Sequence, residues 1–236
     1  MRPIGFSTGA LAYADFRLGL DMTRQAGCKV VELSALRQSE IFPMLDALND
    51  LDLRQFTYVS MHAPSQLEPE MEASVAARLR SELSRQWPMI VHPDAIRDFS
   101  IWREFGKLLC IENMDKRKPI GRTAKELGKI FSELPEASLC FDIGHARQCD
   151  PTMTEAYLIL REFGSKLCQV HVSEVSTSSK HDRLSYTSML AFQEVAHLIP
   201  ENIPLILETP VSSEGMEAEM AYVREALPVE QLSLIA

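Results

Sequence analysis

The chain has 236 residues, 46% of them hydrophobic, and a formal charge of −9 at pH 7, which together suit a globular protein with a sizeable core. The acidic balance disfavours nucleic acid as a partner, because broad binding to its phosphate backbone depends on many lysine and arginine contacts. No apolar run approaches the ~20 residues of a membrane helix, and the first residues lack a signal-peptide core. We therefore expect a cytoplasmic protein without a membrane partner.

Short apolar runs recur along the whole chain. They cover residues 4–7, 29–33, 57–61, 89–91, 108–111, 139–141, 167–172 and 204–207. Such runs are typical of strands that are buried on both faces of a parallel sheet.

Helical patterns lie between these runs. They cover residues 15–26, 39–48, 70–83, 93–105, 124–134, 152–163, 187–198 and 215–226. Gly27 is expected in the left-handed conformation after the first helix, and Thr123 with Glu126 forms a predicted capping box. Thr152 with Glu155 forms a second one.

The alternation of strands and helices predicts right-handed βαβ units. Eight of each favour an α/β fold of the closed (β/α)₈ TIM-barrel type over an open doubly wound sheet. No Gly-x-Gly-x-x-Gly or phosphate-loop motif follows a strand, which weakens a nucleotide-binding alternative. Without a linker or repeat, we predict a single domain over residues 1–236, and no pattern indicates an oligomeric state.

Acidic residues and histidines follow seven of the eight predicted strands, where the active site of a barrel lies. They are Glu32, His62, His92, Glu112, Asp142 with His145, His171 and Glu208. Gly144, between Asp142 and His145, predicts a sharp turn because it has no Cβ. Imidazole and carboxylate without thiolate suit zinc, manganese, cobalt or iron. The set therefore predicts a divalent-metal site with one to three ions.

Each of these residues alone has a more ordinary interpretation. A single buried histidine is more often a hydrogen-bonded core residue than a ligand, and a single glutamate often belongs to an ion pair. For Glu32 we favour an ion pair or a role in holding a ligand histidine. For His197 we favour a surface or packing role, and for His181 the two interpretations are equal.

Seven motifs together resemble the xylose-isomerase-like barrel superfamily, which includes endonuclease IV and the sugar or sugar-phosphate isomerases and epimerases. The resemblance covers essentially the whole chain. It rests on AGCKVVEL (26–33), HAP (62–64), HPD (92–94), IEN (111–113), DIGHA (142–146), HVSE (171–174) and LET (207–209).

In the isomerase and epimerase branch, the resemblance implies one metal ion held by four residues. They are Glu112, Asp142, His171 and Glu208. The two glutamates would transfer a proton at the carbon beside a carbonyl, while the metal stabilises the enediolate and His145 binds a substrate oxygen. Our leading prediction is such an enzyme acting on a small sugar, sugar phosphate or similar carbonyl compound.

In the endonuclease IV branch, the resemblance implies a second ion held by His62, His92 and Glu112, and a third that uses His145. The third also takes an Asp and a His from the loop after residues 167–172, where this chain has His181 and Asp182 in a different order and spacing. The alternative prediction is a multi-metal phosphodiesterase or related hydrolase. A non-catalytic binding barrel is a third hypothesis.

Basic residues follow several of these motifs and predict contacts with a phosphate or carboxylate of the substrate. Lys116, Arg147, His181 and Arg183 are the candidates. A solvated rim is the ordinary alternative, and for Lys116 it is at least as strong.

Overall fold

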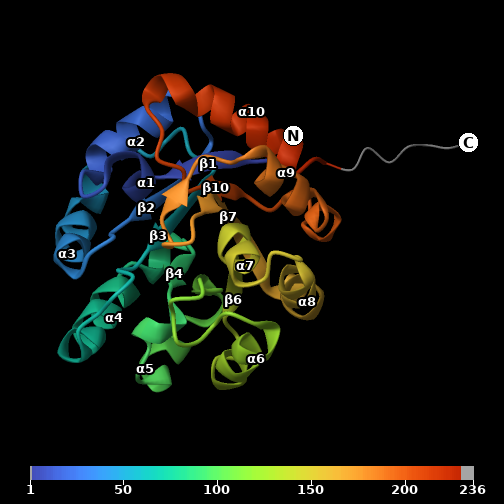
Figure 1. Cartoon of the computed structure of the whole chain (residues 1–236). Helices are drawn as coiled ribbons and strands as arrows, with labels where there is room; N and C mark the ends of the chain where they lie inside the picture. Colours follow the sequence, from blue (N-terminus) through green and yellow to red (C-terminus); the bar gives the residue numbers. More distant parts are fainter. Residues whose placement is uncertain (1, 230–236) are drawn as a thin grey trace, which may run out of the picture.

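Eight parallel strands close into a barrel in the computed structural model, which describes residues 2–229 of the chain (Figure 1). Around the barrel they are β1 (Ile4–Ser7), β10 (Leu205–Leu207), β7 (Leu167–Val172), β6 (Ser138–Asp142), β5 (Leu109–Glu112), β4 (Met89–Val91), β3 (Tyr58–His62) and β2 (Val30–Ser34). Each predicted run overlaps one of these strands, and the predicted (β/α)₈ fold is confirmed.

Helices form the outer layer around the strands, as Figure 1 shows. The outer helices are α2 (Phe16–Gln25), α3 (Gln38–Ala47), α4 (Glu72–Arg80), α5 (Phe99–Arg103), α6 (Ala124–Glu133), α8 (Thr154–Phe163), α9 (Tyr186–Gln193) and α10 (Met216–Ala226). Their apolar faces pack against the strands, and Trp102, Phe141 and Phe192 are among the largest fully buried side chains. No helix within residues 2–229 has the length and apolar character needed to cross a membrane.

Three short elements follow barrel strands directly and were not predicted. Helix α1 (Thr8–Ala12) follows β1, and helix α7 (Ile143–Cys149) follows β6. After β7, strands β8 (Glu174–Val175) and β9 (His181–Asp182) pair as an antiparallel hairpin. All three lie at the C-terminal ends of the strands, where they surround the barrel mouth.

The predicted helix ends are only partly correct. Gly27 has a φ of +73°, as expected for a glycine after a helix. At α6, Thr123 Oγ1 accepts from the Glu126 backbone nitrogen at 3.2 Å, but the Glu126 carboxylate accepts from the nitrogen of Arg122, so only half of the capping box forms. The second predicted box is wrong, because α8 begins only after Met153, which is in the left-handed conformation without a side-chain cap.

Gly144 has a different role from the predicted sharp turn. It lies inside α7, and it is not among the glycines with positive φ. A Cβ at this position would lie 2.4 Å from the carbonyl oxygen of Ser173. Glycine is therefore required because α7 passes very close to the chain after β7.

Candidate metal centre

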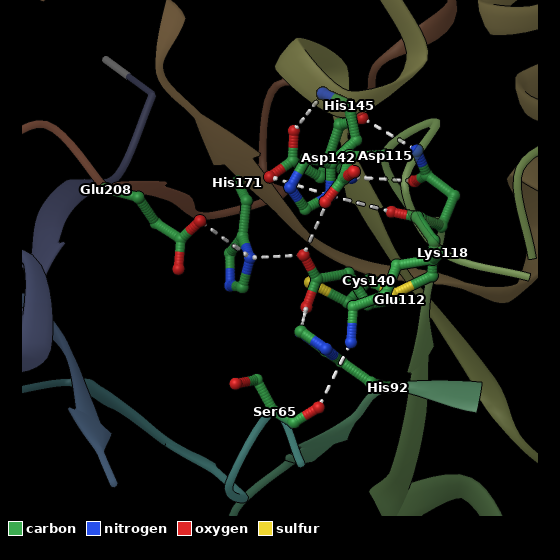
Figure 2. A network of polar contacts seen from close by, with 12 residues as sticks. Ser65, His92, Glu112, Asp115, Lys118, Cys140, Asp142, His145, His171 and Glu208 are labelled. Carbon is green, nitrogen blue, oxygen red and sulfur yellow. Dashed lines mark hydrogen bonds and ion pairs between the residues drawn. The ribbon is translucent and has the colours of Figure 1, made fainter. Parts of the chain in front are cut away.

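All the residues predicted as metal ligands gather at the C-terminal end of the barrel (Figure 2). Their nitrogen and oxygen atoms form overlapping groups in which the ligand atoms lie within 4.8 Å of one another. The groups are His62, His92 and Glu112; Glu112, Asp142, His171 and Glu208; Asp142, His145 and His181; and His62, His171 and Glu208. Glu112 and Asp142 therefore each belong to more than one possible ion site.

Glu112, the last residue of β5, lies in the middle of these groups. Its Oε2 atom lies 3.0 Å from His62 Nε2 and 3.2 Å from His92 Nε2. Its Oε1 atom lies 3.3 Å from His145 Nδ1 and 3.4 Å from His171 Nδ1. Burial alone would raise the pKa of the Glu112 carboxyl, but the charges of His92 and His171 hold it well below its usual range. One carboxylate thus faces two imidazoles on each of its oxygens.

Asp142, at the end of β6, is held by its neighbours in a fixed orientation. The Asn113 side chain donates to the Asp142 carbonyl at 2.8 Å and accepts from its backbone nitrogen at 2.7 Å. Asp142 Oδ1 accepts from the backbone nitrogen of His145 at 2.6 Å and caps α7. Burial raises the pKa of Asp142 to about 6. The Asp142 carboxylate therefore both starts α7 and turns its second oxygen toward the centre.

His171 in β7 is oriented from below by a buried polar network. Its Nε2 atom lies 2.9 Å from Glu32 Oε2, which also accepts from the Gln169 amide at 2.7 Å. The Tyr58 hydroxyl donates to the Gln169 side-chain oxygen at 2.8 Å. If Nε2 donates to Glu32, Nδ1 keeps its lone pair toward Glu112 and Glu208. This contact fits the interpretation that Glu32 holds a ligand histidine.

His181 reaches the same centre from the β8–β9 hairpin. Its Nδ1 atom lies 2.7 Å from Ser173 Oγ and 3.5 Å from Glu208 Oε2. Burial, together with the charge of His145, lowers the pKa of His181 to about 4. This imidazole is therefore neutral near pH 7, which is the form that binds metal ions.

The hairpin is held over the centre by residues that the sequence did not single out. Gln148 Nε2 donates to the side-chain oxygen of Ser179 at 2.8 Å, and Ser179 Oγ donates to Asp115 Oδ1, also at 2.8 Å. Asp115 lies just after β5 and Gln148 near the end of α7. The one sequence signal for this role of Asp115 is its proximity to Glu112 along the chain.

The basic residues around the centre are placed differently from the prediction. Arg147 contacts Ser188 Oγ at 3.0 Å, and Arg183 Nε donates to Glu219 Oε2, also at 3.0 Å. Neither arginine, nor Lys116, lines the cavity of about 210 Å³ above the ligand groups. Lys118, Arg117 and the predicted His181 line it, and the substrate contacts of Lys116, Arg147 and Arg183 remain predictions.

Lys118 is already paired where it enters this cavity. Its ammonium donates to Asp94 Oδ2 at 2.8 Å and to the Ser65 carbonyl at 3.1 Å, a contact that Figure 2 shows. The Arg117 guanidinium donates to the Ser179 carbonyl at 3.0 Å. Both cations therefore support the walls of the cavity as well as lining it.

No protein-family model and no curated protein matches this sequence. Solved structures do match in fold. The apo form of 3-keto-D-glucoside 4-epimerase from E. coli is 11% identical, with a TM-score of 0.58 over 96% of this chain and 99% of that one. A xylose isomerase-like TIM barrel protein from Mycobacterium smegmatis, in complex with magnesium, is 15% identical, with a TM-score of 0.57 over 96% and 98% of the two chains.

The chain has the xylose isomerase-like barrel fold. A putative sugar phosphate isomerase/epimerase from Anabaena variabilis is a third match, at 12% identity and a TM-score of 0.58 over 96% of this chain and 99% of that one. The predicted resemblance is thus confirmed at the level of the fold.

Within this xylose isomerase-like barrel, the donor set fits a divalent metal. The groups offer imidazole nitrogens and carboxylate oxygens without a thiolate, which suits zinc, manganese, cobalt or iron. Asp142 Oδ2, His171 Nδ1 and His92 Nδ1 are buried polar atoms that find no hydrogen-bond partner in residues 2–229. Buried groups of this kind are costly unless something pairs with them. For Asp142 and His171, an ion between the ligand atoms would be that partner.

Proposed function

We propose that this chain is a metal-dependent hydrolase that cleaves small phosphoesters at a centre of two or three divalent ions. The observation that carries the proposal is the Glu112 carboxylate, with His62 and His92 on one oxygen and His145 and His171 near the other. Glu112 would therefore contribute a ligand atom to each of two neighbouring ion sites. A site for one ion would leave His62 and His92 without a ligand role.

The candidate ligand residues divide into three sets around Glu112. His62 and His92 with Glu112 would hold one ion, and the four-residue group of Glu112, Asp142, His171 and Glu208 a second. Asp142, His145 and His181 would hold a third. When bound, neighbouring ions lower the pKa of a water molecule toward neutrality and offset the charge of a phosphoryl group.

The remaining contribution of the chain is to bind and orient the substrate. The cavity above the ligands measures about 210 Å³, which suits a phosphoester head group rather than a polymer. Lys118 and Arg117 line it and offer positively charged donors to phosphate oxygens. Because both are also tied to the cavity wall, they would hold the phosphate in one orientation.

An isomerase or epimerase that acts on a sugar, sugar phosphate or similar carbonyl compound is the second candidate. It is favoured by the group of Glu112, Asp142, His171 and Glu208, which offers four ligands for one ion and includes two glutamates. Burial raises the pKa of Glu208, as suits a group that accepts and returns a proton. In this case His62 and His92 would only form hydrogen bonds to Glu112.

Metal counting separates these candidates. In protein purified without chelator, the hydrolase proposal predicts two or three tightly bound ions per chain, and the isomerase candidate predicts one. His92→Ala should remove one ion and lower hydrolysis of bis(p-nitrophenyl) phosphate by about a hundredfold or more. His197→Ala is the control, because His197 is exposed and belongs to none of the ligand groups. One ion in the wild type, together with an active His92→Ala variant, would reject the hydrolase.

The same preparation tests the non-catalytic alternative. If no metal is bound and added manganese, zinc or cobalt leaves the melting temperature unchanged, neither enzyme proposal stands, because a ligand of the folded state raises stability.

A further inference from the structure

A second cavity, of about 420 Å³, adjoins the candidate metal centre. The two cavities share Leu36, His181 and Glu208 as lining residues, so they lie side by side. The volume lies within the ordinary range for sites that bind small molecules. The two candidate functions above do not use this second cavity.

The walls of the second cavity are mainly apolar, in contrast to the metal centre. Ala10, Tyr13, Leu36 and Pro210 line it. Tyr13 is 68% exposed and Leu36 is 37% exposed, so two large apolar side chains stand in water beside a cluster of charged groups. Adjacent exposed apolar side chains at the edge of a pocket are typical of a ligand-binding surface.

The backbone at Tyr13 gives a second, independent observation. Tyr13 ends α1 with φ 53° and ψ −121°, a conformation that strains any residue other than glycine. Strained residues of this kind concentrate at functional sites, where the side chain has a role that glycine could not supply. The aromatic ring, rather than the turn, therefore accounts for a tyrosine at this position.

Gly9 fixes the position of the neighbouring wall. A Cβ on Gly9 would lie 2.9 Å from the Leu36 Cδ2 atom, so glycine lets helix α1 approach Leu36 closely. Helix α1 and the segment after β2 therefore lie close together along this wall.

We propose that this second cavity, which we call the apolar subsite, binds an aryl or branched alkyl group of the substrate while the substrate's polar head binds at the metal centre. The inference rests on the proposed function for the head group. His181 and Glu208 lie on the boundary between the two cavities, so the apolar group is joined directly to the head group. The substrate class is therefore a phosphoester of an apolar alcohol rather than an unsubstituted sugar phosphate.

Calorimetric titration of manganese-loaded protein with two non-hydrolysable probes tests the subsite. We expect phenylphosphonate to bind at least about tenfold more tightly than methylphosphonate, because the ring removes apolar surface from water. Tyr13→Gly should reduce this preference severalfold and leave methylphosphonate binding unchanged, because Tyr13 lines the second cavity and not the cavity of the metal centre. Tyr186→Ala removes a tyrosine that is 63% exposed and lines neither cavity, so it serves as the matched control.

The Tyr13→Gly variant also excludes unfolding as an explanation. Glycine adopts the backbone conformation of Tyr13 without strain, so this variant should melt no lower than the wild type. A purely structural tyrosine would give the opposite pattern, with lower stability and unchanged probe binding.

The possible failures of the two proposals differ. Equal binding of both phosphonates, or an unchanged preference in Tyr13→Gly, overturns the apolar subsite and leaves the hydrolase proposal standing. The same holds if phosphoester is hydrolysed but neither probe binds. If neither probe binds and no phosphoester is hydrolysed, the metal centre and the subsite are rejected together.

Discussion

Glu32 is fully buried, and its Oε2 atom lies 2.9 Å from the Nε2 atom of His171. We predict that Glu32→Gln lowers metal affinity about 10- to 100-fold, because the amide removes the charge that holds the Nε2 proton. Competition with a chromophoric chelator measures the affinity. Ser60→Ala is the control, since its hydroxyl lies 3.4 Å from Glu32 and contributes a weak contact at most. Wild-type affinity in Glu32→Gln would show that another group orients His171.

Single residues also show how much of the candidate site can be predicted from the sequence. Glu112, Asp142 and His171 were recognisable because each ends a short apolar run, and the carboxyl ends of barrel strands meet at one mouth. The partners of Arg147 and Arg183 could not be predicted, because they are not visible from the local sequence. Glu219, which accepts a hydrogen bond from Arg183, lies 36 residues away in helix α10.

Helix α7 carries His145 and passes close to the chain after β7, so its position matters for the candidate metal centre. We predict that Gly144→Ala destabilises the protein by about 1–3 kcal/mol, since the new methyl group meets the Ser173 carbonyl. Gly128→Ala in α6 is the matched comparison. Its new Cβ would have neighbours only at 3.7 Å and beyond, so we expect a gain of about 0.5–1 kcal/mol.

Urea unfolding of both glycine variants, with and without manganese, measures these differences. The Gly144→Ala variant should also bind metal more weakly, because a shifted α7 moves His145 away from Asp142. Equal stability of the two variants would show that α7 can move away from Ser173 at little cost.

Among the secondary-structure elements, the barrel strands could be predicted from the sequence and the short elements could not. A buried strand of three to six residues leaves a distinct apolar run between polar segments. Helix α1 has five residues and each strand of the β8–β9 hairpin has two, which is too short for a periodic pattern. These elements form because the barrel brings their neighbours together.

For the molecule as a whole, protons and metal ions compete for the same imidazoles. Burial alone would lower the pKa of His62, but the hydrogen bond to Glu112 raises it to about 9. Burial alone would also lower the pKa of His145, but the charge of Asp142 is the main cause that raises it to about 10. In the metal-free protein both histidines are therefore charged at pH 7, and metal binding must release their protons.

The sign of the resulting pH dependence follows from these raised values. An unfolded histidine titrates near pH 6.5, so the two histidines stabilise the metal-free fold fully below about pH 6.5. This contribution is lost as the pH rises toward 9 and 10. We predict that the melting temperature of the metal-free protein falls across this window, whereas that of the manganese-loaded protein changes less, because its ligand histidines are already neutral.

Thermal unfolding at pH 6.5, 8 and 9.5 checks this prediction, and metal titration in weak buffer at pH 7.5 checks the proton release. Parallel pH profiles with and without manganese, or binding without proton release, would contradict it.

The β8–β9 hairpin has one more consequence, which concerns protein engineering. Its anchors to the rest of the protein include the side chains of Gln148 and Asp115, and within the described chain its two strands pair only with each other. We therefore predict that the hairpin, which carries the candidate ligand His181, can be exchanged. Replacing it with a short glycine–serine connection should leave a closed barrel with the other ligand groups intact, and barrels of this kind could then be fitted with other hairpins to change ion number.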